Sequence, residues 1–273
     1  GTLLMNLAHE IGENKCSIYS QDISQKSSSF LRLNLILNNL VHSIPNAIQG
    51  NTIKDPYHKE NNKIKLFDFI VSNPPFKTDF SNYRNDLETK ENRPRFFAGI
   101  PKIPPKDKKK MEIFLLFIQH IISSLSKNGK AAIVVPSGFL KSKSIGQIIR
   151  KYLIENKMLT GVISMPKNIF ANTGTRVSIM FIDKESVNDD PIFINATKLG
   201  IAVKEGDNEK TVLSLEEESL ITSTFKKRLA KENFSIKVSE AEIIKKKYFF
   251  SAGDYMVVKI DYSEISKTEF DKK

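Results

Sequence analysis

The residues best suited to chemistry are Asn73, Pro74, Pro75 and Phe76, which directly follow an apolar run at residues 67–72. The two prolines lack an N–H group, so the chain stays extended there and its carbonyl groups stay free. The Asn73 side-chain oxygen and the Pro74 carbonyl are then two hydrogen-bond acceptors beside the ring of Phe76. Together these groups are suited to bind one flat group that bears an amine.

The chemistry that fits such a site is methyl transfer to an amine. The exocyclic amine of a nucleobase is a poor nucleophile because its lone pair is delocalised into the ring. Two acceptors on its N–H groups would move the nitrogen toward tetrahedral geometry and favour attack on a sulfonium methyl group. An aromatic ring would hold the base by stacking once the base has left the duplex. The alternative is that residues 73–76 are only an ordinary exit from a strand.

Length, charge and cysteine content narrow the class of protein. The chain has 273 residues, of which 40% are hydrophobic, enough for one large domain or one domain with an appendage. Its net charge of +11 and sequence pI of about 9.5 favour a nucleic-acid partner, although Lys-rich soluble proteins share this composition. Cys16 is alone, which excludes an intrachain disulfide and fits the reducing cytoplasm. We find no signal peptide or apolar run of transmembrane length, and we expect no membrane association.

Hydrophobic periodicity predicts alternating helices and strands. Helices are expected at residues 2–11, 24–41, 111–125, 145–155, 216–231 and 239–247, and strands at residues 17–20, 47–49, 67–71, 131–135, 158–165, 177–182 and 191–196. This alternation predicts an α/β fold with a doubly wound, mostly parallel sheet, closed by an antiparallel edge hairpin from residues 158–182. Residues 67–71 would be a central strand. Asn73 would then lie at the carboxyl end of that strand, where such folds bind ligands.

Two further regions differ from this pattern. Residues 77–110 form a long basic and aromatic stretch that indicates a loop facing nucleic acid, the alternative being a merely solvated loop. The residues concerned are Lys77, Phe80, Tyr83, Arg84, Arg93, Arg95, Phe96, Phe97, Lys106, Lys108, Lys109 and Lys110. A change of texture near residue 200 predicts a catalytic domain at 1–200 and a helical C-terminal extension at 201–273. The extension would dock a partner subunit, or would only pack against the domain.

With these elements placed, the sequence resembles the modification (M) subunit of type I restriction-modification systems, an adenine-specific DNA methyltransferase. The stretches that carry the resemblance are residues 17–22 with 32–37, 50–53, 67–76, 114–120 with 130–138, and 162–170 with 173–175. The resemblance implies a Rossmann-like methyltransferase domain that depends on S-adenosyl-L-methionine. Its substrate would be the exocyclic amine of an adenine flipped out of double-stranded DNA. Its partners would be a specificity (S) subunit and a second M subunit, with a restriction (R) subunit as a further one.

The resemblance also implies roles for single residues. Asn73 and Pro74 would accept hydrogen bonds from the target amine, Pro75 would complete the motif, and Phe76 would stack on the base. The cofactor-binding residues would be Gly1, Thr2, Asp22, Ile23, Asn51, Thr52 and Asn73. No catalytic metal is implied.

Two of these cofactor roles have ordinary structural alternatives. Asp22 would bind the ribose hydroxyls of the cofactor, and its alternative is the N-cap of the helix that follows. Asn51, where the family usually has Asp, and Thr52 would border the cofactor adenine, and their alternative is a turn.

The family has a glycine-rich cofactor loop before its first helix, and here only Gly1 and Thr2 correspond to its end. We therefore expect an N-terminally truncated chain that binds the cofactor weakly or not at all. Two other functions remain open: methylation of RNA or of a protein glutamine, and a non-catalytic piece that contacts DNA or acts as a scaffold.

Overall fold

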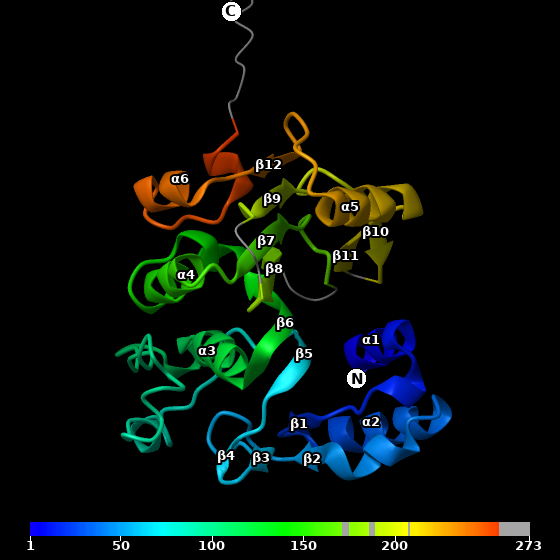
Figure 1. The fold of residues 1–273 in the computed structure, drawn as a ribbon, viewed down its shortest axis with the longest axis vertical. Helices are drawn as coiled ribbons and strands as arrows, with labels where there is room; N and C mark the ends of the chain where they lie inside the picture. The colour runs from blue at the N-terminus through cyan, green and yellow to red at the C-terminus, as the bar shows by residue number, and fades with distance from the viewer. Residues whose placement is uncertain (171–174, 186–188, 207, 257–273) are drawn as a thin grey trace, which may run out of the picture.

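A six-stranded sheet is the centre of the fold, with strand order β12-β9-β7-β8-β6-β5 (Figure 1). The computed structural model describes residues 1–170, 175–185, 189–206 and 208–256. The strands of the sheet are β5 (Phe67–Ser72), β6 (Leu125–Pro136), β7 (Leu159–Ser164), β8 (Val177–Asp183), β9 (Ile192–Asn195) and β12 (Ser235–Lys237). Helices α3 (Phe114–Ser124) and α4 (Ile145–Glu155) pack against it and bury a large apolar core. The predicted α/β class is confirmed.

The sheet is mixed, whereas the sequence predicted a mostly parallel one. Strands β5 and β6, and likewise β7 and β9, pair in parallel, while β6–β8, β7–β8 and β9–β12 pair antiparallel. Strands β7 and β8 do form the predicted antiparallel pair, but they lie inside the sheet and not at its edge. The reason is that β8 also pairs with β6, from Lys130↔Asp183 to Pro136↔Val177. The alternation of apolar residues shows that a strand is buried, and it does not show which strands are its neighbours.

Strand β5 is at an edge of this sheet, which corrects its prediction as a central strand. The strands on its far side, β1 (Ser20–Asp22) and β2 (Ala47–Gln49), form a separate two-stranded parallel sheet. Because β5 has an apolar sequence but no second neighbour in the described residues, Phe69 is 48% exposed and the adjacent Leu66 is 52% exposed. The sequence of β5 is that of an interior strand, and its surroundings are those of an edge.

The N-terminal elements form a small unit with its own core. Helix α2 (Gln25–Leu37) packs on β1 and β2, while α1 (Thr2–Ile11) shares their core through Ala8 and also contacts β5. The buried residues of this core are Ala8, Ile18, Leu31, Leu35, Leu40 and Ala47. Gly12, with φ of +99°, ends α1 as predicted, because residues with a side chain rarely adopt that conformation.

Residues 77–110 are a loop, as predicted, but most of its aromatic side chains do not face outward. Phe80 and Phe96 are buried with Leu87 in a second core that rests on Met111 and Leu116. Assigning these aromatic residues to nucleic-acid binding was therefore wrong. An aromatic side chain in a basic loop can face a base or anchor the loop, and the sequence does not distinguish the two uses.

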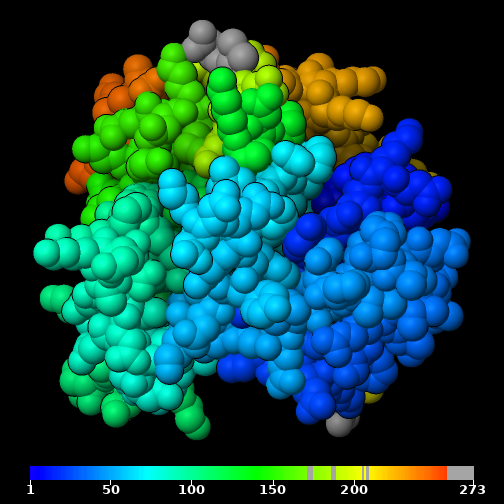
Figure 2. Space-filling model, turned by 60° about the horizontal axis from the view of Figure 1, so that its bottom comes forward, coloured from blue at the N-terminus to red at the C-terminus, as the bar shows by residue number. Residues whose placement is uncertain are grey.

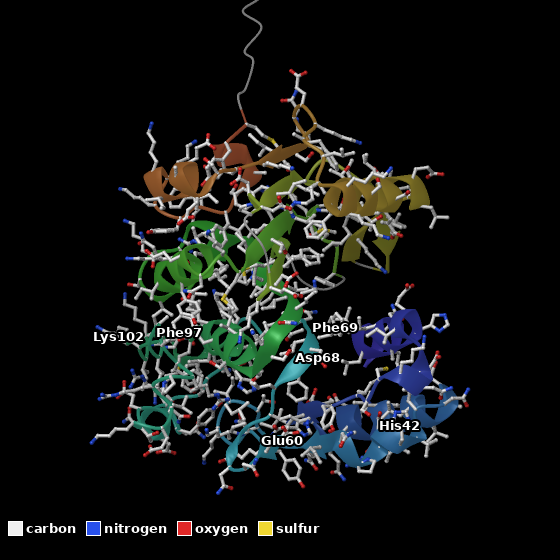
Figure 3. All side chains as sticks on the ribbon, viewed as in Figure 1. His42, Glu60, Asp68, Phe69, Phe97 and Lys102 are labelled. Carbon is white, nitrogen blue, oxygen red and sulfur yellow. The ribbon has the colours of Figure 1, made fainter. Side chains whose placement is uncertain are left out.

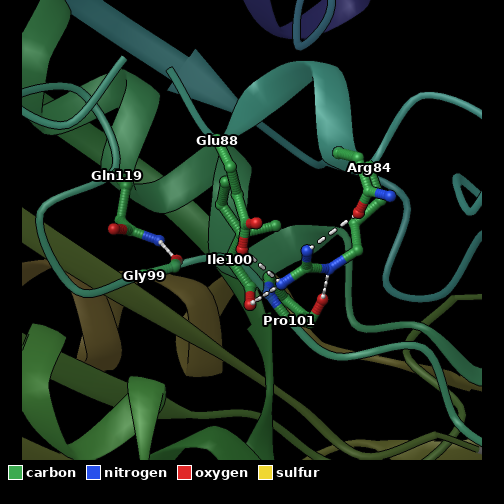
Figure 4. A network of polar contacts seen from close by, with 7 residues as sticks. Arg84, Glu88, Gly99, Ile100, Pro101 and Gln119 are labelled. Carbon is green, nitrogen blue, oxygen red and sulfur yellow. Dashed lines mark hydrogen bonds and ion pairs between the residues drawn. The ribbon is translucent and has the colours of Figure 1, made fainter. Parts of the chain in front are cut away.

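Polar contacts also fix this loop (Figure 4). Arg84 donates to the carbonyl of Pro101 at 3.0 Å and forms a 2.8 Å ion pair with Glu88. Gln119 of α3 donates to the carbonyl of Gly99 at 3.0 Å. The loop is therefore held by both side-chain packing and hydrogen bonds.

A short hairpin, β3 (Lys59–Glu60) and β4 (Lys63–Ile64), leads from the N-terminal unit into β5.

The region predicted as a helical extension also contains strands. Its elements are β10 (Ile201–Glu205), β11 (Asn208–Val212), α5 (Leu215–Lys227), β12 and α6 (Glu240–Lys245). Strands β10 and β11 form a hairpin, and β12 joins the main sheet beside β9. Buried Arg150 ties the end of this region to α4 by donating to the carbonyl of Tyr248 at 2.6 Å. The boundary near residue 200 stays a prediction, and residues 257–273 of the extension lie outside the described residues.

No helix in the described ranges is both long and apolar enough to cross a bilayer.

Candidate functional site

The predicted catalytic residues lie in the segment that leaves the carboxyl end of β5. Asn73 and Pro75 are exposed and Pro74 is buried. Across the described residues, the Asn73 carboxamide has no hydrogen-bond partner, so its oxygen is available to a ligand. Phe76 is half-buried and packs edge-to-face on Phe114 of α3, with ring centroids 6.3 Å apart. One side of the Phe76 ring thus belongs to the core, and its stacking on a base stays a prediction.

Asp22 and Ile23 lie exposed at the end of β1. The Asp22 Oδ1 atom accepts from the amide of Ser24 at 2.7 Å, and Ser24 is the N-cap of α2. The alternative of Asp22 as this N-cap is therefore wrong. Its Oδ2 atom has no hydrogen-bond partner among the described residues, and Ile23 beside it is 71% exposed. A free carboxylate oxygen beside an exposed apolar side chain suits a ribose and the face of a base.

Asn51 and Thr52 follow β2 and lie beside the end of β1. The Asn51 Oδ1 atom accepts from the amides of Ile53 and Lys54, each at 3.0 Å, so this residue does form the turn that was its alternative. Its NH2 group is the part left to bind a ligand. Thr52 donates its hydroxyl to the carbonyl of Gln21 at 3.1 Å, which fixes the two strand ends together. Of the predicted cofactor residues, the structure thus places Asp22, Ile23, Asn51 and Thr52 in one cluster.

A buried cation that the sequence did not reveal fixes this turn. Arg95 donates to the carbonyls of Thr52 and Ile53 at 2.7 and 2.8 Å, and to Nδ1 of His120 at 3.1 Å. Burial lowers the pKa of Arg95 to about 10, so the side chain remains a cation at neutral pH. Burial, with the adjacent Arg95 charge, lowers the pKa of His120 to about 3, so the imidazole is neutral. Assigning Arg95 to a nucleic-acid surface was wrong; no spacing signal marks it as a residue that positions the turn.

Gly1 and Thr2 begin α1, and both are exposed. The Gly1 carbonyl accepts from the amides of Leu4 and Met5 at 3.0 and 3.1 Å, which leaves the first amides of the helix free. Free amides at a helix N-terminus attract an anion such as a carboxylate. Within the described residues, no hydrogen bond joins Asn73 to Gly1 or to the cluster at Asp22. The Thr173-Gly174 part of the resemblance lies outside the described residues.

Cations gather on the surface of the loop at residues 77–110. The exposed ones are Lys77, Lys90, Arg93, Lys102, Lys106, Lys108, Lys109 and Lys110. Figure 2 shows this loop in teal on one side of a face and the N-terminal elements in blue on the other, with residues 50–75 between them. The exposed Lys77 is close in sequence to Asn73, so the cationic surface begins at the candidate site. The part of the chain that the structure describes has no group of three or more His, Cys, Asp and Glu side chains that could hold a metal ion.

Comparison with known proteins gives a family match and several similar sequences. A family model described as "N-6 DNA Methylase" matches residues 2–263. The type I restriction enzyme MpnII methylase subunit of Mycoplasma pneumoniae is 26% identical, over 100% of this chain and 49% of the relative. The MjaIX methylase subunit of Methanocaldococcus jannaschii is 29% identical, over 91% of this chain and 44% of the relative. The chain thus spans about half the length of these curated relatives.

Solved structures agree on the fold. The methyltransferase subunit of a type I restriction-modification system from Streptococcus thermophilus superposes with a TM-score of 0.74 and 24% sequence identity. The match covers 93% of this chain and 51% of that chain.

Proposed function

Because the chain belongs to the N-6 DNA methylase family, we propose that it transfers a methyl group from S-adenosylmethionine to N6 of adenine in DNA, as part of a type I modification enzyme. The observation that carries this proposal is the exposed Asn73 carboxamide at the end of β5, which has no hydrogen-bond partner among the described residues and precedes two prolines. Its oxygen and the Pro74 carbonyl would accept the two N–H groups of the adenine amine. Phe76 would limit the position of the base through its own packing on Phe114.

The residues around Asp22 fit the nucleoside half of S-adenosylmethionine. The free Asp22 Oδ2 would accept from the ribose hydroxyls, Ile23 would cover the adenine, and the Asn51 NH2 group would donate to an adenine nitrogen. Gly1 and Thr2 would bind the carboxylate of the methionine half through the free amides of α1. When bound, S-adenosylmethionine supplies the electrophilic methyl group on its sulfonium sulfur.

The proposed partners follow from the charge and from the relatives. The exposed lysines of the loop at residues 77–110 would bind DNA phosphates without reading sequence. The relatives are named as methylase subunits of type I restriction enzymes. We therefore place this chain in a cytoplasmic complex with a specificity subunit and a second M subunit, to which a restriction subunit would attach.

The test is methyl transfer by the native methylase complex with the Asn73→Ala substitution. The lost hydrogen bond is made to an amine that gains positive charge, so we expect a rate about 10- to 100-fold lower. Asn128→Ala changes another exposed asparagine, in β6, and should leave the rate unchanged. An Asn73→Ala rate within threefold of wild type would contradict the role of Asn73. Equal tritium incorporation into RNA or protein substrates would contradict the choice of DNA.

A further inference from the structure

The loop at residues 77–110 sends one buried cation to the turn that follows β2. Arg95 is only 4% exposed, and its guanidinium donates to the carbonyls of Thr52 and Ile53, although Thr52 is 43 residues away in the sequence. Figure 3 labels Phe97 and Lys102 of this loop on the left and His42 of the N-terminal unit on the right. Arg95 therefore links the loop to the turn through which the chain leaves the N-terminal unit.

The packing of Ile53 makes the same connection. Ile53 has no exposed surface and lies in the core of the loop, together with Phe80 and Phe96. Its amide and that of Lys54 both donate to the Oδ1 atom of Asn51, each at 3.0 Å. These two donors determine which end of the Asn51 carboxamide is the oxygen, and they leave its NH2 group for a ligand. The orientation of Asn51 therefore depends on residues of the loop.

The Arg95 guanidinium is buried without an anion. Its hydrogen-bond partners are the two carbonyls and Nδ1 of His120, and no carboxylate pairs with it within the described residues. A buried cation without an anion is unfavourable, and an apolar side chain of similar volume often stabilises a core at least as well. Stability alone therefore does not explain an arginine at this position. A planar guanidinium does suit two neighbouring acceptors, because it directs several N–H groups from one rigid plane.

We propose that Arg95 is a positioning residue for the adenosine half of S-adenosylmethionine. It acts without touching the cofactor: by holding the carbonyls of Thr52 and Ile53, it directs the Asn51 NH2 group toward the adenine. The loop at residues 77–110, whose exposed lysines would bind DNA phosphates, then also supports the cofactor site from inside the fold. This inference rests on the proposed function, because the contact between Asn51 and adenine is part of that proposal.

The test is ligand binding by the native methylase complex, measured by calorimetry. The two ligands are S-adenosylmethionine and 5′-methylthioadenosine, which has the nucleoside but no amino-acid part. Arg95→Met keeps an unbranched side chain in the core and removes the donors. It should weaken the binding of both ligands at least about tenfold, because the turn that orients Asn51 is no longer held. The KM for S-adenosylmethionine should rise by a similar factor, while kcat at saturating cofactor should change less than about twofold.

Arg84→Met is the matched control. Arg84 holds the same loop by donating to the carbonyl of Pro101 at 3.0 Å, and none of its hydrogen bonds or ion pairs among the described residues reaches the turn (Figure 4). This variant should bind both ligands as wild type does. Arg95→Lys retains a cation but not the planar set of donors, so its affinity should lie between those of wild type and Arg95→Met. Circular dichroism checks that each variant is folded, and Arg95→Lys keeps the test open if Arg95→Met does not fold.

Hydrogen–deuterium exchange tests the positioning step without a ligand. The amides of Ile53 and Lys54 are protected by their hydrogen bonds to Asn51. In the native complex, Arg95→Met should speed the exchange of these two amides at least about tenfold, because local opening of the turn becomes easier. Arg84→Met should leave their exchange at the wild-type rate.

The outcomes separate this inference from the proposed function. Equal ligand affinity in Arg95→Met and Arg84→Met would overturn the inference alone, as would wild-type exchange of the Ile53 and Lys54 amides in Arg95→Met. A lower kcat with an unchanged KM would also overturn it, because Arg95 would then act in the chemical step. A wild-type complex that binds neither ligand would contradict the proposed function, and this inference with it.

Discussion

The contact between Arg95 and His120 makes the stability of the fold sensitive to acid. His120 Nδ1 accepts a hydrogen bond from Arg95 Nε at 3.1 Å, and therefore carries no proton in the folded protein. A proton on Nδ1 would replace this bond with repulsion between two cations. In the folded state the pKa of His120 is lowered to about 3, against 6.5 for an unperturbed histidine.

The sign of the effect follows from which state binds the proton. Between pH 6.5 and pH 3 the unfolded chain binds a proton at His120 and the folded chain does not, so lowering the pH favours unfolding. The contribution is fully present above pH 6.5 and is lost progressively as the pH falls toward 3. At pH 5 the loss in free energy of unfolding is about 2 kcal/mol relative to pH 7.5.

The assay is urea unfolding of wild type and of His120→Asn at a series of pH values from 7.5 to 5. Asparagine retains an acceptor oxygen for Arg95 and does not titrate, so the stability difference between the two proteins should shrink by about 2 kcal/mol across this range. His42→Asn changes an exposed histidine and serves as the control for the substitution itself. A wild-type and His120→Asn difference that is constant with pH would refute the reasoning, as would an NMR titration midpoint for His120 above 6.

Two further predictions concern packing. Arg150→Leu should lower the free energy of unfolding by about 3–5 kcal/mol, because the carbonyls of Tyr248, Phe139 and Ser142 lose their buried donor. Urea unfolding measures this loss. Faster proteolysis near residues 240–256 should accompany it. Gly161→Ala should cost about 1–3 kcal/mol in a thermal melt, because an added Cβ would lie 2.5 Å from the Ile192 carbonyl oxygen and 2.8 Å from the Phe225 ring. A Gly161→Ala protein as stable as wild type would show that both Ile192 of β9 and Phe225 of α5 can move away from β7.

The sequence predicted the helices and strands whose apolar spacing and ends are marked by residues within or next to the element. The helix at residues 2–11, the strand at 47–49 and the helix at 145–155 have the bounds expected, because apolar spacing and glycine or polar ends mark them locally. Strand order was not predictable in the same way. Nothing in residues 177–182 indicates that β8 lies between β6 and β7, because the choice of neighbour depends on contacts far apart in the sequence.

The candidate site was predictable only in part. The strand-end position of Asn73 and the closeness of Asp22 to Asn51 follow from local pattern and from parallel pairing. Arg95 was misassigned because a buried arginine and a DNA-binding arginine have the same neighbours in a basic loop. What separates them is the pair of carbonyls at Thr52 and Ile53, which the chain brings near only when folded.

The place of β12 has a consequence for synthesis on the ribosome. Residues 235–237 cover the edge of β9, which is made some forty residues earlier. Until that late segment has left the exit tunnel, a nascent chain carries an open β9 edge with Ile192 and Ile194 uncovered. Chaperones that guard emerging β-strands should therefore remain bound to this polypeptide until residue 237 has left the exit tunnel.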